Sequence, residues 1–115
     1  MPDVFENKFF DESDPDVFLM LEFQKGDRVF FENLMRKYYK RVLNFIYRLT
    51  GNVETAEDLT QDVFLKVYKA AAQYHPKSKF QTWLYTIAKN AALNELRRRK
   101  RPVMSLDAEM SSGGE

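Results

Sequence analysis

The chain has 115 residues, of which 44% are hydrophobic and 30% are charged, and it contains one histidine and no cysteine. This length allows a single domain, and an aromatic content of 15% excludes wholesale disorder. No apolar run approaches the roughly 20 residues of a membrane span. Without cysteine there are no disulfides and no thiolate ligands, and His75 alone is too little for a metal site or a catalytic triad. We therefore expect no enzyme, no metal and no cofactor.

The formal net charge of +1 hides a strong segregation of charge along the chain. Residues 1–16 carry a net charge of −5, residues 77–101 carry +7, and residues 102–115 carry −3. Five consecutive bases, RRRKR, close the basic block at 97–101. The dipole of a helix end favours one or two cations, so a run of five indicates a polyanion partner, with nucleic acid ahead of a membrane surface. A solvated helix end remains the alternative.

The first two predicted helices follow from capping residues and hydrophobic spacing. Ser13 and Asp14 offer an N-cap before Pro15, so we expect a short helix over about 15–25 that stops at Gly26. A longer helix is predicted over about 27–50, and Gly51 follows it as a C′ glycine. Its apolar residues recur at spacings of three and four: Phe31, Leu34, Met35, Tyr38, Val42, Phe45, Ile46 and Leu49.

The third predicted helix begins near residues 53–55, with Thr55 as a candidate N-cap, and runs to about residue 72. At 100° per residue, the core side is formed by Ala56, Leu59, Val63, Val67, Ala70 and Ala71. The opposite side presents two carboxylates, an amide and a leucine: Asp58, Gln61, Asp62 and Leu65. A leucine among acids is typical of a docking patch for a basic partner. A solvated acidic face explains the spacing equally well.

The fourth predicted helix covers about 80–100, and Pro102 ends it. Its core side is predicted to hold Leu84, Ile87, Ala88 and Ala91. A second strip, bordered by Trp83, carries side chains that hydrogen-bond base edges and phosphates: Thr86, Asn90, Asn94, Arg97 and Arg101. The preceding loop mixes aromatics, bases and a hydroxyl, which suits an unpaired strand. Alternatively, Tyr74, Phe80 and Trp83 fill the core.

The predicted fold class is all-α, a small bundle of about four helices joined by short loops. We expect an acidic N-terminal segment over residues 1–14, a helical domain over 15–101 and a linker over 102–115.

Two sequence stretches resemble region 2 of the bacterial sigma-70 family, in its extracytoplasmic-function (ECF) group. They are TAEDLTQDVFLKVYKA at 55–70 and FQTWLYTIAKNAALNELRRRKR at 80–101, and the likeness covers residues 31–101. The resemblance implies an all-helical domain that binds the β′ clamp helices of core RNA polymerase and melts the promoter −10 element. It also implies a cytoplasmic location, an anti-sigma factor as partner, and no small-molecule substrate or membrane span.

The resemblance assigns polymerase binding to the outer side of the third helix, at Asp58, Gln61, Asp62 and Leu65. It assigns the non-template strand to the loop around 74–82, which would cage a flipped base, and to the fourth helix. The predicted DNA-binding residues are Tyr74, Lys77, Ser78, Lys79, Trp83, Thr86, Asn90, Asn94, Arg97, Arg98 and Arg101.

Taken together, the pattern predicts two opposed surfaces, an acidic one for the polymerase and a basic one for an opened strand. Complete ECF factors carry a second domain that reads the −35 element, so we expect this chain to be a fragment of a longer factor, with a natural single-domain relative as the alternative. The alternative function is a helical adaptor whose basic helix binds a partner protein or another polyanion.

Overall fold

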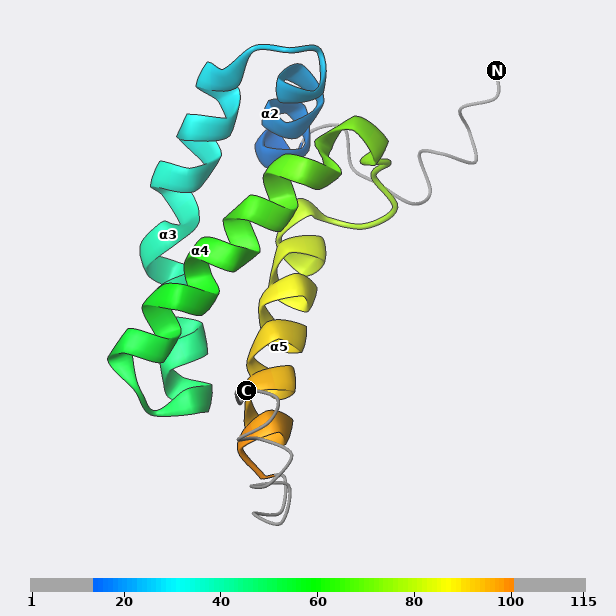
Figure 1. Cartoon of the computed structure of the whole chain (residues 1–115). Coiled ribbons are helices and arrows are strands. Elements are labelled where there is room, and N and C mark those ends of the chain that lie inside the picture. Colours follow the sequence, from blue (N-terminus) through cyan, green and yellow to red (C-terminus); the bar gives the residue numbers. More distant parts are fainter. Residues whose placement is uncertain (1–13, 101–115) are drawn as a thin grey trace.

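The computed structural model describes residues 14–100, and the regular structure within that range is entirely helical. The elements are α2 (Pro15–Gln24), α3 (Arg28–Thr50), α4 (Val53–Ala70), the short 3₁₀ helix η1 (Ala71–Gln73) and α5 (Phe80–Arg99) (Figure 1). The prediction of an all-α bundle of about four helices is confirmed. Predictions for residues 1–13, for Arg101 and for 102–115 lie outside the described residues.

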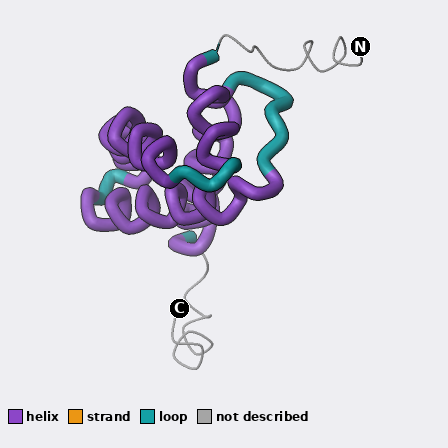
Figure 2. Tube along the Cα trace, turned by 90° about the horizontal axis from the view of Figure 1, so that it is seen from above, coloured by secondary structure: helices purple, strands orange, loops and turns teal. Residues whose placement is uncertain are grey.

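The long helices α3 and α4 form an antiparallel hairpin, and α5 packs against both of them (Figure 1). The short helix α2 packs on α3 and meets η1 at the end of the bundle where the loop before α5 begins. Seen from above, that loop makes a wide excursion between two helices, whereas the α3–α4 turn is tight (Figure 2). Within residues 14–100, no helix is long and apolar enough to cross a membrane.

Asp14 caps two helices at once. One carboxylate oxygen accepts a hydrogen bond from the backbone N–H of Asp16 at 2.9 Å, which caps α2 as predicted. The other oxygen accepts from the N–H of Phe80 at 3.1 Å, where α5 begins without a side-chain cap of its own. The N–H groups at a helix start need acceptors, so this one side chain fixes the start of α2 and of α5 together.

The N-cap of α4 is Asn52, and the prediction of Thr55 as the cap is wrong. Asn52 has an extended backbone, and its side-chain oxygen accepts from the N–H of Thr55 at 2.8 Å. Gly51 directly before it is in the left-handed region at φ 72°, which ends α3 as expected. The helix therefore starts three residues earlier than a Thr55 cap requires, and the Thr55 hydroxyl is available for other contacts.

The core is formed by side chains from all four α-helices, α2 to α5. Its largest fully buried side chains are Tyr38, Phe80, Met20, Leu34, Ile46 and Leu84. Of the residues predicted to be core on α4 and α5, six are buried, namely Ala56, Val63, Val67, Ala71, Leu84 and Ala88. The other four, Leu59, Ala70, Ile87 and Ala91, are partly exposed. Phe64 and Ala92 are also buried, because each helix packs against more than one neighbour.

A buried carboxylate ties α2 to α3. Asp16 is 3% exposed and accepts hydrogen bonds from the hydroxyl of Tyr38 and from Lys37 Nζ, the latter at 2.7 Å. Burial, together with the Asp16 carboxylate, raises the pKa of Tyr38 well above its ordinary value. By composition Asp16 counts among the acids that give residues 1–16 their negative charge, whereas the structure makes it part of the core.

Candidate functional site

The outward face of α4 is placed as predicted. Asp58, Gln61 and Asp62 are exposed, and Leu65 keeps 50% of its surface exposed. An exposed leucine one turn after a carboxylate adds apolar surface beside an anionic edge. This combination suits a partner that brings both cations and apolar side chains.

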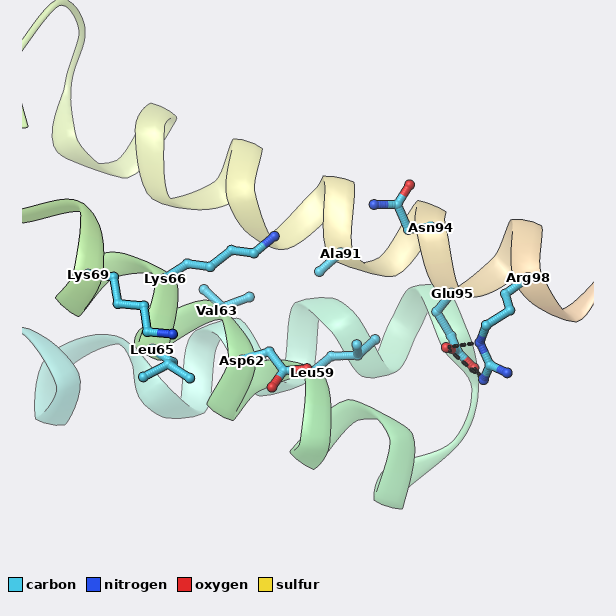
Figure 3. Close-up of a pocket in the computed structure, with 10 residues that line it drawn as sticks. All are labelled: Leu59, Asp62, Val63, Leu65, Lys66, Lys69, Ala91, Asn94, Glu95 and Arg98. Atoms are coloured by element: carbon cyan, nitrogen blue, oxygen red, sulfur yellow. Dashed lines mark hydrogen bonds and ion pairs between the residues drawn. The ribbon is translucent and has the colours of Figure 1, made fainter. Parts of the chain in front are cut away.

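A groove of about 380 Å³ separates α4 from α5 and joins the two predicted surfaces (Figure 3). Asp62 and Leu65 line it from α4, and Asn94 and Arg98 line it from α5. The prediction of two opposed surfaces is therefore corrected, because residues predicted to bind the polymerase and residues predicted to bind DNA line one groove. A helical wheel gives directions about one axis only, and the side-by-side packing of α4 and α5 brings these two edges together.

The polar strip along α5 is exposed, and two of its side chains are hydrogen-bonded to each other. Thr86, Asn90, Asn94 and Arg97 are exposed. Arg97 donates a hydrogen bond to the Asn94 side-chain oxygen at 2.6 Å, so the two side chains are held together on the surface. The Thr86 hydroxyl instead donates to the Thr82 carbonyl at 2.7 Å, within the helix itself.

Part of the basic run has a structural role. Arg99 donates to the Thr50 carbonyl at 3.0 Å and to the Thr55 hydroxyl at 3.2 Å, which ties the end of α5 to the α3–α4 turn. Arg98 makes a two-pronged contact with Glu95, with distances of 2.8 and 3.0 Å. These hydrogen bonds from Arg98, with help from Arg99, lower the pKa of Glu95. The arginines of this run therefore stabilise the bundle, in addition to any contact they make with a partner.

The loop before α5 turns its apolar side chains inward. Tyr74 is 7% exposed and packs edge-on against Trp83, with ring centroids 4.9 Å apart. Its ring is thus not available for stacking on a base, and its prediction as a DNA-binding residue is corrected. Burial raises the pKa of Tyr74 to about 12, and its hydroxyl has no hydrogen-bond partner among residues 14–100. Phe80 is buried too, whereas Trp83 is only partly so.

The polar residues of the same loop face outward. Lys77 and Lys79 are exposed, and Ser78 is partly exposed with its hydroxyl donating to the Lys79 carbonyl at 3.3 Å. The start of the loop is fixed by Gln24 of α2, whose side-chain amide donates to the carbonyls of Ala71 and Tyr74 at 2.9 and 2.8 Å. Sequence reasoning missed Gln24, because nothing local marks a contact across about fifty residues.

Comparison with known proteins gives a consistent result. Residues 34–102 match the model of sigma-70 region 2. The chain is 45% identical over 67 residues to RNA polymerase sigma factor YlaC of Bacillus subtilis, covering 58% of this chain and 39% of that protein. It is 36% identical over 88 residues to ECF RNA polymerase sigma factor SigW of Bacillus subtilis, covering 76% and 46%. It is 35% identical over 95 residues to the ECF RNA polymerase sigma-E factor of Escherichia coli, covering 81% and 49%. The chain thus spans less than half the length of these relatives.

Proposed function

Because the chain belongs to the sigma-70 region 2 family, in its ECF group, we propose that it binds core RNA polymerase and recognises and melts the promoter −10 element. The observation that carries this proposal is the groove between α4 and α5, which Asp62 and Leu65 line from α4 and Asn94 and Arg98 line from α5. The proposed role makes or breaks no covalent bond, and it places the protein in the cytoplasm. An anti-sigma factor is the regulatory partner that this role implies.

Polymerase binding is proposed for the α4 face made of Asp58, Gln61, Asp62 and Leu65. The carboxylates would steer and orient the encounter with the basic surface of the β′ clamp helices, because complementary charge raises association rates. Leu65 would supply an apolar contact beside these carboxylates. In support, the polar groups of this face are exposed rather than turned into the core.

DNA binding is proposed for the loop before α5 and for the exposed strip on that helix. The residues assigned are Lys77, Ser78, Lys79, Trp83, Thr86, Asn90, Asn94, Arg97 and Arg98. The lysines and arginines would neutralise phosphates. This contribution to the affinity does not depend on the DNA sequence and weakens as the salt concentration rises. Selectivity would come from a base extruded at the loop, since unstacking costs least at base-pair steps that stack weakly.

The polymerase arm of the proposal is tested by reversing charge on α4. The double variant Asp58→Lys, Asp62→Lys should lose core binding by at least tenfold at low salt, while its circular dichroism and melting temperature stay close to those of the unaltered chain. Glu57→Lys is the matched control for the single variant Asp58→Lys, because each reverses one charge and the two positions lie about 100° apart around the same helix. Unchanged core binding by the folded double variant would contradict the proposal.

The DNA arm is tested with a single-stranded oligonucleotide of the −10 non-template strand. Replacing Arg97 by alanine should weaken binding and make the slope of log K against log salt about 0.7 shallower, as expected for one lost phosphate contact on a single strand. Replacing Asn90 by alanine should weaken binding without changing that slope. Both variants should retain core binding, and loss of both partners together would show that the two surfaces are wrongly assigned.

A further inference from the structure

Hydrogen bonds from the two ends of α2 hold the two ends of the loop that precedes α5. At the start of the loop, the Gln24 side-chain amide donates to the carbonyls of Ala71 and Tyr74 at 2.9 and 2.8 Å. At its end, the Asp14 carboxylate accepts from the N–H of Phe80 at 3.1 Å. Asp14 is the N-cap of α2 and Gln24 is its last residue, so these side chains stand about 15 Å apart along the helix. One rigid helix therefore sets both ends of the loop.

Between these attachments the loop divides into buried and exposed side chains. Tyr74, Pro76 and Phe80 are buried, which anchors the backbone in the bundle. Lys77 and Lys79 are exposed on the part of the loop that makes the wide excursion (Figure 2). The exposed side chains take their positions from the backbone, and the backbone is fixed by the buried anchors and by α2.

Trp83 contacts both ends of the same loop. Its ring centroid lies 4.9 Å from that of Tyr74 and 5.7 Å from that of Phe80. Trp83 is only partly buried and is among the residues proposed to bind DNA, so a shift of either end of the loop changes the surface that meets the strand. It is also the only tryptophan in the chain, and its fluorescence therefore reports the geometry of the loop without a label.

We propose that Gln24 and Asp14 are positioning residues that set the sequence selectivity of the loop for the −10 element, and this inference rests on the proposed function. Neither residue belongs to the surface proposed for DNA, and both act through the loop. Capture of an extruded base needs a loop with one geometry, whereas phosphate contacts along α5 do not. A loop released from α2 has to be ordered on binding, and this cost falls on the preferred strand alone.

The test compares two affinities of the full chain, one for the −10 non-template oligonucleotide and one for the same bases in scrambled order. Gln24→Met keeps the length of the side chain and removes both donors. Gln73→Met makes the same change at an exposed glutamine of η1, and Asn52→Ala removes the cap of α4 alone, so it lowers stability away from the loop. The readout is the ratio of the two affinities, because partial unfolding lowers both equally.

We expect Gln24→Met to lower this ratio by about three- to tenfold, the range for one or two lost hydrogen bonds. Asp14→Ala should lower it too, and the two changes together should lower it further. Gln73→Met and Asn52→Ala should change it less than twofold. Quenching of Trp83 fluorescence by acrylamide should increase in Gln24→Met, because a released loop uncovers the ring, and should stay unchanged in both controls.

Three results would overturn the inference. An unchanged ratio in Gln24→Met, with a melting curve that shows it folded, would refute the positioning role and leave the proposed function standing. A lower ratio with unchanged quenching of Trp83 would show that Gln24 does not act through the loop. If the unaltered chain showed no preference for the −10 oligonucleotide, the DNA arm of the proposed function would fail, and the inference would fail with it.

Discussion

Replacing Asp14 by alanine should destabilise this bundle more than the loss of an ordinary helix cap. The side chain accepts one hydrogen bond at the start of α2 and a second at the start of α5. Loss of one cap costs about 1 kcal/mol, so Asp14→Ala should cost about 2 kcal/mol. For a domain of this size that corresponds to a fall in melting temperature of roughly 8–16 °C. Asp14→Asn keeps one acceptor oxygen and should cost about half as much.

The matched control is Asp27→Ala, because Asp27 caps α3 alone through a single bond to the N–H of Val29 at 3.0 Å. Urea unfolding followed by circular dichroism gives the free energy of unfolding for each variant, with an unchanged m-value as the condition for comparison. Equal losses from Asp14→Ala and Asp27→Ala would refute the reasoning that Asp14 caps α5. Such a result would also remove the link between α2 and the loop that precedes α5.

Two further predictions concern the basic run and the buried tyrosines. Arg99→Ala should lower the free energy of unfolding by about 1 kcal/mol, because it loses a charged hydrogen bond to the Thr50 carbonyl. The control Lys100→Ala should have little effect. Equal effects of the two variants in urea unfolding would contradict the structural role of Arg99. The pKa of Tyr74 is raised from 10 to about 12. The stability that the neutral Tyr74 side chain contributes is therefore complete below pH 10 and is lost as the pH rises from 10 to 12. The free energy of unfolding falls by no more than about 1.4 kcal/mol per pH unit in that range. Tyr74→Phe should flatten that alkaline loss and leave stability at pH 7 unchanged or higher, since the hydroxyl has no partner within the described part of the chain; a large loss at pH 7 would show that it has one.

The helices and their exposed faces could be predicted from the sequence because both depend on local spacing. The N-cap at Asp14, the glycine stop at Gly51 and the outward position of Asp58 are of this kind. Thr55 and Asn52 are both competent caps by residue type, and only the backbone geometry of the α3–α4 turn selects Asn52.

What the sequence could not predict depends on contacts between helices. The second cap made by Asp14, at the start of α5, joins residues 66 positions apart. Asp16 belongs by composition to the acidic residues of 1–16, and only the packing of α2 on α3 buries it against Tyr38. The shared groove depends on how α4 and α5 lie side by side, which no helical wheel contains.

The meeting of both proposed surfaces at one groove has a mechanistic consequence. Leu65 and Asp62 on α4 share that groove with Asn94 on α5, so a protein docked on α4 and a strand held on α5 would be neighbours. A partner on α4 can therefore reach the strip on α5 that is proposed to bind DNA, and substitutions in the groove itself, such as Asn94→Ala, are expected to affect both partners. Substitutions away from the groove are expected to affect one partner each, DNA for Asn90 and the polymerase for Asp58.

The most direct test of the central claim is site-specific photo-crosslinking in a complex of the full chain, core polymerase and a −10 non-template oligonucleotide. A photoreactive side chain replaces Gln61 on α4, Asn90 on α5 or, as a control, the exposed Tyr47 on α3. We predict that position 61 crosslinks to the β′ subunit, that position 90 crosslinks to the oligonucleotide, and that position 47 crosslinks to neither. Crosslinking of position 61 to DNA, or of position 90 to polymerase alone, would contradict the assignment of the two faces.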